Sequence, residues 1–328
     1  MKFYKRGLLR LIEASGGLSL LRWKNRFVPQ VLMFHRIIKS SFINGLAPDE
    51  FEKQITYVKK NFRLVPIETL LSEVSSNQIK PYTMAITFDD GHQDFYYNAW
   101  PILKKHHVPA SLYVTTGFVN NDTWLWPDLL KYVILNAKNK SIDIFPIGAL
   151  SLAEIDVMAS WHILGDFCLT LPETEREQFI KKIAMLTDIY PPPAPVPPFL
   201  PVTWDQLREM VDDGLDVGSH TITHPILNSI NPARIHEELA GSATMINNNL
   251  NIIPKGICYP NGRLSDINDL VIQQAAQIGY RYGLLARNHP ISSNAPFLIG
   301  RLPTHDDFDY FKWIVSHRST EHDSSYLN

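Results

Sequence analysis

The chain has 328 residues, 45% of them hydrophobic, so it can bury a sizeable core as one large domain with an insertion or as two modest domains. Lys and Arg number 31 against 33 Asp and Glu, a formal net charge of -2, and this balance argues against a nucleic-acid-binding protein. The two cysteines, Cys168 and Cys258, are too few for a disulfide framework.

Residues 1–30 form a basic segment with seven Lys or Arg residues, one acid and several interleaved leucines. Its longest uncharged stretch, 14–21, is too short for a membrane-spanning helix and unlike the apolar region of a secretory signal. The segment could lie on an anionic membrane surface, or pack on the domain with its basic face in solvent. We therefore expect a cytoplasmic protein, with peripheral contact to the inner membrane surface through residues 1–30 as an option.

Short apolar runs alternate with helical spacing over most of the chain. A helix is predicted after Asp49, which is a plausible N-cap, and another over 94–106. Buried strands that alternate with helices indicate parallel βα units, and hence an α/β sheet or barrel. The predicted strands cover residues 31–34, 84–88, 110–114, 215–217, 256–259 and 282–285.

The pattern changes between residues 122 and 200. Helical stretches at 151–164 and 172–186 precede seven prolines that fall between 191 and 201, a run that can neither continue a helix nor lie inside a sheet. We interpret the region as a mostly helical insertion with a proline-rich connector; a separate C-terminal domain is less favoured because the β/α pattern resumes. The predicted organisation is a basic segment (1–30), one α/β domain (31–121 and 201–316), the insertion (122–200) and a polar tail (317–328).

Two adjacent carboxylates, Asp89 and Asp90, end a predicted strand in the segment Thr87-Phe88-Asp89-Asp90-Gly91. They would repel each other and be partly desolvated, which is costly unless a cation or hydrogen bonds compensate. Active sites of parallel α/β folds collect at strand ends, so the pair is a candidate site. A turn with a helix N-cap is the alternative, since Asp-Gly is a common turn pair.

Two histidines four residues apart, His220 and His224, follow the strand predicted at 215–217. Such a pair can reach one metal ion through neutral imidazole nitrogens, although either could instead be a surface or capping residue. With a strand-end carboxylate they make a three-ligand site that keeps a position open for water, the pattern of catalytic zinc. A third strand end, at 258–262, breaks into a tight turn that can present a backbone N–H to an oxyanion, or is only a turn.

These segments together resemble the polysaccharide deacetylase family of the carbohydrate esterase type, with its NodB-homology domain. The resemblance covers about 31–121 and 201–305. It implies a distorted parallel (β/α) barrel, hydrolysis of N-acetyl groups, and one divalent metal ion, usually zinc, with cobalt, nickel or manganese as alternatives. The matching motifs are TFDDG at 87–91, Gly214 to Thr221 with His224 beyond, Tyr259-Pro260-Asn261-Gly262, and a start at 31–36 that resembles the bacterial polysaccharide-synthesis branch.

The resemblance also implies roles for particular residues. Asp90, His220 and His224 look like the metal ligands. Asp89 resembles the general base that takes a proton from the attacking water. The backbone N–H around Asn261 resembles a donor to the oxyanion.

The chain departs from the family pattern in two places. Cys258 stands where an Arg that pairs with the base is common, and Arg301 is the expected replacement, with Arg263 nearer in sequence. The late LxH signature that carries the general acid is not evident, so His35 is the first candidate for the acid and His305 the second.

The expected substrate is an N-acetylated glycan, or a lipid- or nucleotide-linked sugar. The alternatives are an O-deacetylase or another amide hydrolase on the same metal site, and a catalytically silent relative that binds glycans. Trp124 and Trp126 could line the rim of a cleft, whereas Tyr97 and Trp100 are expected in the core. His92, beside the two carboxylates, is interpreted as a turn residue.

Overall fold

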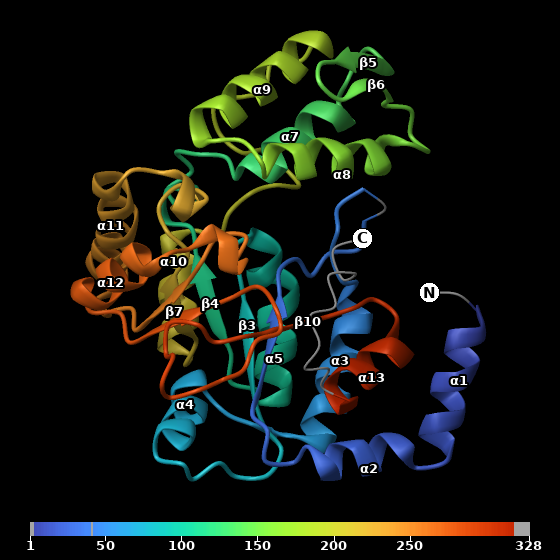
Figure 1. Ribbon diagram of the computed structural model, residues 1–328, viewed down its shortest axis with the longest axis vertical. Helices are drawn as coiled ribbons and strands as arrows, with labels where there is room; N and C mark the ends of the chain where they lie inside the picture. Colours follow the sequence, from blue (N-terminus) through green and yellow to red (C-terminus); the bar gives the residue numbers. More distant parts are fainter. Residues whose placement is uncertain (1–2, 41, 318–328) are drawn as a thin grey trace.

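The computed structural model describes residues 3–40 and 42–317, and within them eight strands form one parallel sheet (Figure 1). The strand order is β10-β1-β3-β4-β7-β8-β9, with the short β2 paired to β3. The strands are β1 (Gln30–Phe34), β2 (Arg63–Leu64), β3 (Thr83–Phe88), β4 (Ser111–Val114), β7 (Asp216–Ser219), β8 (Gly256–Cys258), β9 (Tyr282–Leu284) and β10 (Leu302–Pro303).

The two ends of this strand order approach each other through residues 299–303. Ile299 bridges Leu284 of β9, and Leu302 and Pro303 then pair with β1, so the sheet curls into a distorted barrel. This confirms the fold class predicted from the sequence. Helices cover the outside, and most strand residues are therefore buried on both faces, which is why the strands appear in the sequence as unbroken apolar runs.

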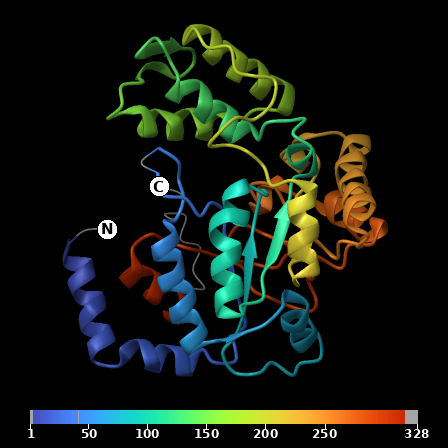
Figure 2. The same ribbon diagram turned by 180° about the vertical axis from the view of Figure 1, so that it is seen from behind.

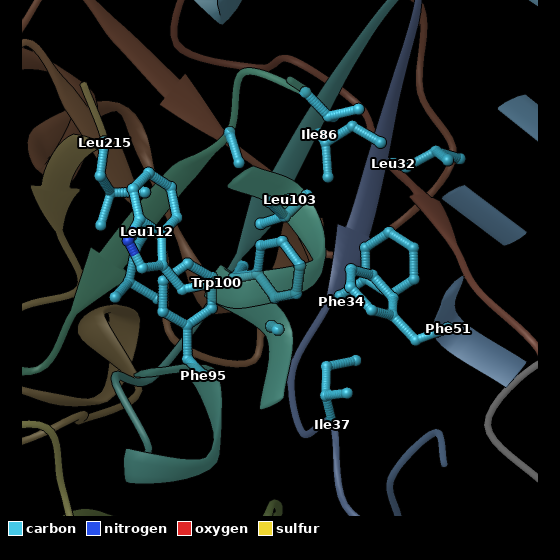
Figure 3. Close-up of a cluster of buried hydrophobic side chains, with 14 of the residues drawn as sticks. Leu32, Phe34, Ile37, Phe51, Ile86, Phe95, Trp100, Leu103, Leu112 and Leu215 are labelled. Carbon is cyan, nitrogen blue, oxygen red and sulfur yellow. The ribbon is translucent and has the colours of Figure 1, made fainter. Parts of the chain in front are cut away.

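The core lies between the sheet and the helices that follow its first strands (Figure 3). The rings of Phe34 of β1 and Phe88 of β3 stack with centroids 5.1 Å apart, and Phe51 of the helix that follows β1 packs edge-on against them at 5.1 and 5.8 Å. The helices around the barrel are α3 (Pro48–Asn61), α4 (Ile67–Ser75), α5 (Trp100–His106), α6 (Thr116–Val119), α10 (Trp204–Asp212), α11 (Pro232–Leu250), α12 (Asp269–Ile278) and α13 (Phe308–His317).

Two helix starts differ from the prediction. The N-cap of α3 is Ala47, so Asp49 lies in the first turn, where its charge faces the positive end of the helix dipole. The helix predicted over 94–106 is divided into a π-helical turn, η1 (Phe95–Ala99), and α5.

The segment 122–200 lies over one end of the barrel (Figures 1 and 2). It contains its own hydrophobic cluster, which includes Leu130, Leu164 and Ile183. The helix predicted for 151–164 begins only at Val157, because Ser151 ends an antiparallel hairpin that the sequence did not predict and residues 154–156 form a turn. Its elements are α7 (Trp126–Leu135), β5 (Ser141–Ile144), β6 (Gly148–Ser151), α8 (Val157–Cys168) and α9 (Glu173–Leu186).

The end of the proline-rich connector lies beside the loop that follows β3. The backbone N–H of Gln93 donates to Leu200 O at 2.9 Å, and that of Val202 donates to Gly91 O at 2.8 Å. Pro201 forms an isolated antiparallel bridge with His92 between these bonds. The connector therefore holds the loop that carries Asp89 and Asp90.

The N-terminal helices α1 (Phe3–Ala14) and α2 (Gly17–Lys24) pack on the barrel at α13, and α2 also contacts α3. Arg22 donates to Tyr57 Oη at 2.7 Å and to Ser316 Oγ at 3.1 Å. This is the packed arrangement that the sequence left open. Across the described ranges, no helix has the length and apolar character needed to cross a membrane.

Candidate metal centre

The loops at the strand ends contain strained backbone. Asp90 after β3, Thr221 and His224 after β7, and Asn261 after β8 have φ angles of 74°, 69°, 61° and 56°. Residues other than glycine seldom adopt this left-handed conformation, which costs about 1–3 kcal/mol each where the surroundings impose it. Such strain is typical of functional sites, and here it occurs in three separate loops.

The structure brings Asp90, His220 and His224 into one group. Asp90 Oδ1 lies 3.4 Å from His220 Nε2 and 3.7 Å from His224 Nε2. These three ligand atoms lie within 4.8 Å of one another, which is the spacing needed to hold one ion. The histidine rings are buried, with centroids 4.8 Å apart.

Hydrogen bonds orient the two histidines. His220 Nδ1 donates to the carbonyl oxygen of Cys258 at 2.7 Å, which directs its Nε2 toward Asp90. Burial, and secondarily His220, lowers the pKa of His224 to about 3, so its imidazole is neutral at neutral pH, as a metal ligand must be.

Glu238 of α11 supports the loop between these histidines. Its fully buried carboxylate accepts the backbone N–H of Ile222 at 2.7 Å and that of Thr223 at 2.9 Å. Glu238 could not be identified from the sequence, because a single Glu within a helical pattern carries no local signal of such a contact.

Asp89 is held by Arg301, the residue expected to replace the missing family arginine. The guanidinium donates to both carboxylate oxygens at 2.7 and 2.6 Å, and both side chains are buried. Burial alone would raise the pKa of Asp89, but the charge and hydrogen bonds of Arg301 outweigh it and lower that pKa. Arg263, the nearer alternative, begins the 3₁₀ turn η3 (Leu264–Asp266) and makes no contact with Asp89 among the described residues.

Two candidates for the general acid line one cavity of about 440 Å³, which lies between the loop after β1 and residues 304–306. His35 Nε2 is 3.7 Å from Asp89 Oδ2, and the His35 side chain is 44% exposed. His305 is 35% exposed, and its Nδ1 accepts the backbone N–H of Asp307 at 2.9 Å. Within the described chain, His35 contacts Asp89 and His305 does not.

Asn261 follows β8 in a tight turn. Neither its backbone N–H nor its Nδ2 has a hydrogen-bond partner within residues 3–40 and 42–317. The next residue must be glycine, because a Cβ at Gly262 would lie 2.3 Å from Ala286 N and its φ is 60°. Among the residues that the structure describes, an unpaired backbone donor is thus present at the residue predicted to bind the oxyanion.

The residues fit a divalent cation at Asp90, His220 and His224 better than at a second group formed by Asp89, His220 and Cys258. In the second group Asp89 is already bonded to Arg301 through both oxygens. Burial also raises the pKa of the Cys258 thiol, which disfavours the thiolate that binds metal. One carboxylate and two imidazoles, with coordination positions left over, are the donor set of a catalytic zinc site.

Three other residues differ in part from their sequence interpretation. His92 directly follows the turn at residues 90–91, but it is buried, and its Nε2 lies 2.7 Å from Asp128 Oδ2 of α7. Trp100 is buried as expected, but Tyr97, in the π-helical turn, is 60% exposed. Trp124 is buried against Phe199 of the connector rather than on a rim.

The chain is similar in sequence and in fold to several known proteins. The sequence model of a family described as polysaccharide deacetylase matches residues 76–283. The chain is 21% identical to the putative polysaccharide deacetylase YxkH of Bacillus subtilis over 256 residues, which cover 77% of this chain and 63% of that protein. It is 27% identical over 109 residues to poly-beta-1,6-N-acetyl-D-glucosamine N-deacetylase of Staphylococcus aureus. This match covers 28% of this chain and 38% of that protein. The chain thus spans less than two thirds of the length of both relatives.

Solved structures share the fold. The deacetylase PplD of Streptococcus pyogenes, solved in complex with acetate, has a TM-score of 0.57 at 21% identity, covering 86% of this chain and 94% of that one. IcaB from Ammonifex degensii has a TM-score of 0.57 at 18% identity, covering 88% of this chain and 97% of that one. At these identities the likeness shows the fold alone.

Proposed function

The chain belongs to the polysaccharide deacetylase family, and on that premise we propose that it is a metal-dependent hydrolase that removes N-acetyl groups from an N-acetylated glycan, or from a lipid- or nucleotide-linked sugar. The observation that carries the proposal is the buried group of Asp90, His220 and His224 next to a carboxylate, Asp89, that is held by an arginine. The substrate class is supported by the name of the Staphylococcus aureus relative, which acts on an N-acetylated glucosamine polymer.

Asp89 is suited to the role of general base. A divalent ion at Asp90, His220 and His224 would supply Lewis acidity, which lowers the pKa of a water and polarises a carbonyl. The lowered pKa keeps Asp89 ionised at neutral pH and ready to accept a proton from the attacking water. Arg301 holds both carboxylate oxygens and so sets the direction from which Asp89 accepts that proton.

Asn261 and His35 complete the reaction. As water adds to the acetamide carbonyl, the backbone N–H of Asn261 donates to the oxygen that gains negative charge. His35, exposed to the cavity and 3.7 Å from Asp89, delivers a proton to the nitrogen as the carbon–nitrogen bond breaks. The products are acetate and a free amine, and the proton taken by Asp89 balances the one given by His35.

The test compares wild type with His224→Ala on β-1,6-linked N-acetylglucosamine oligosaccharides with added Zn²⁺. We expect wild type to bind one ion per chain and to release acetate and free amine in equal amounts, and His224→Ala to lose both properties. Acetate without a free amine, measured on an O-acetylated glycan, would favour O-deacetylation. Glycan binding without any product would favour a silent relative. Equal metal content in the two proteins would remove His224 from the ligand set.

The N-terminal helices support a further part of this proposal, contact with an anionic membrane surface. Five large apolar side chains of residues 8–27 are 52–69% exposed although the helices themselves are packed. Residues 1–30 contain seven of the 31 Lys and Arg residues and one of the 33 acidic residues, which gives this segment a net charge of +6. The remaining 24 basic and 32 acidic residues give the rest of the chain a net charge of -8. The exposed apolar residues are Leu8, Leu11, Leu20, Trp23 and Phe27.

Aromatic and basic groups are combined on this surface. The Arg26 guanidinium lies 4.6 Å from the Trp23 ring centroid and 4.9 Å from that of Phe27, and Lys24 is exposed. Amphipathic helices of this composition bind in the interfacial plane of anionic bilayers, with each basic residue near the surface contributing about 1 kcal/mol.

Vesicle binding tests the membrane contact. Wild type should sediment with phosphatidylserine-containing vesicles and less with pure phosphatidylcholine, and the double variant Leu20→Ala/Trp23→Ala should bind several-fold more weakly. Ile253→Ala, at an exposed apolar position outside these helices, is the control. Unchanged partitioning of the double variant would disprove the membrane contact, and activity on soluble oligosaccharides should not change in either case.

A further inference from the structure

Asp128 is an insertion residue whose side chain bonds to a barrel residue beside the metal centre. It lies in the first turn of α7, and its Oδ2 accepts a hydrogen bond from His92 Nε2 at 2.7 Å. The His92 side chain is 3% exposed, with its ring edge-on to Phe118 at 5.1 Å. His92 follows Asp90 by two residues, so this bond connects the insertion to the loop that carries a proposed metal ligand.

The other nitrogen of the same ring faces Asp90. A carboxylate can only accept, so the proton of the bond to Asp128 belongs to His92 Nε2. His92 Nδ1 is 3.7 Å from Asp90 Oδ2 and has no hydrogen-bond partner among the described residues. Asp90 thus has the His92 ring beside one oxygen and the ligand histidines beside the other.

Asp90 needs such support because little else restrains its side chain. Its contacts with described side chains lie at 3.4–3.7 Å, longer than good hydrogen bonds. Its backbone has a φ of 74°, a conformation that persists only where the surroundings impose it. The ring of His92, fixed at its far end by Asp128, limits the directions in which the carboxylate can turn.

We propose that the insertion orients Asp90 for metal binding through Asp128 and His92, which act as positioning residues. The inference rests on the metal site of the proposed function. Without the bond from Asp128, the His92 ring can rotate and the carboxylate can leave the direction that faces His220 and His224. Residues that orient metal ligands in this way typically change metal affinity about 10–100-fold.

The test is the dissociation constant for Zn²⁺, measured on metal-free protein by competition with a chromophoric chelator, a readout that needs no substrate. Asp128→Ala should weaken binding at least about 10-fold. Asp128→Asn should restore most of the affinity, since the amide oxygen can still accept the Nε2 proton. Asp188→Ala is the matched control, because it removes an insertion carboxylate whose partner is the exposed Lys138, and it should leave affinity unchanged.

Thermal melting of the metal-free proteins separates orientation from damage to the fold. If Asp128→Ala melts at a much lower temperature than the control, the variant His92→Gln replaces it as the test of the proposal. Gln can keep a donor to Asp128 while removing the ring nitrogen beside Asp90, so this variant should also bind Zn²⁺ more weakly. The proposal would be overturned if Asp128→Ala, or His92→Gln where it is used instead, bound Zn²⁺ with wild-type affinity. Wild-type affinity in His224→Ala would show instead that the metal site itself is wrong.

Discussion

The barrel edge and the insertion above it handle buried charge in different ways. At the barrel edge, the charge of Asp89 is balanced by Arg301 through two hydrogen bonds, and both groups stay ionised. In the insertion, Lys131 is buried with its Nζ 3.9 Å from the Trp161 ring centroid, and burial lowers its pKa to about 8. The first arrangement keeps a reactive group charged, whereas the second tolerates a charge within an apolar cluster.

This difference indicates that the barrel edge and the insertion have different roles. The barrel carries the proposed metal ligands, the proposed base and the proposed oxyanion donor at three strand ends, in loops with strained backbone. The insertion folds around a separate cluster, and its Asp128 accepts a side-chain hydrogen bond from His92 beside the candidate metal centre. Changes at the barrel edge should therefore affect chemistry, and changes inside the insertion should affect stability first.

The largest expected effect is that of Asp89→Asn at the barrel edge. The amide cannot accept a proton from the attacking water, and removal of a general base costs about 10²–10⁴-fold in turnover. Because Asp89 is outside the ligand set, Zn²⁺ content should remain one per chain. Parallel measurements of kcat and metal content check this, with Asp90→Asn as the comparison that should lose metal. Full turnover in Asp89→Asn would mean that another group, such as His35, is the base.

Arg301→Ala should have a smaller effect on turnover and a large one on stability. It leaves the Asp89 carboxylate buried without its partner, which costs about 3–5 kcal/mol. Since Arg301 lowers the folded-state pKa of Asp89, its stabilisation is present above the unfolded-state pKa and is lost as pH falls through the folded value. The stability gap between the two proteins should thus narrow in acid.

Urea unfolding at a series of pH values measures this gap, and the acidic limb of the pH–rate profile should shift upward in Arg301→Ala. A gap that is constant with pH would show that Arg301 acts by packing alone.

The smallest effect on turnover is expected from Leu164→Ala in the insertion. Leu164 and Leu112 are both fully buried, and truncating either should cost about 2–5 kcal/mol. Leu112 of β4 pairs in register with Phe88, the residue before Asp89, so Leu112→Ala should also reduce kcat. Leu164→Ala should leave kcat within a few-fold. Denaturant unfolding and kcat at saturating metal are measured for both variants. If Leu164→Ala lost as much kcat as Leu112→Ala, the insertion would take part in the chemistry more directly.

The sequence alone was sufficient wherever the signal is local. Buried parallel strands appear as apolar runs, and motifs at their ends come together because the carboxyl ends of neighbouring strands share one edge. For this reason Asp89, Asp90, His220 and His224 could be nominated together, and the barrel predicted, before any contact was known. The strand at 83–88 differs from its prediction by one residue.

Tertiary structure decided which side chains are partners. Arg301 is 212 residues from Asp89 and was chosen only by resemblance over the nearer Arg263. Nothing in the sequence around Asp128 or Glu238 indicates the buried groups that they contact, since such bonds depend on how whole elements pack. The hairpin of β5 and β6 was missed because its short strands alternate in exposure within a region that otherwise has helical spacing. Local periodicity records what each element buries, whereas the choice of partner across the molecule is made only when the elements assemble.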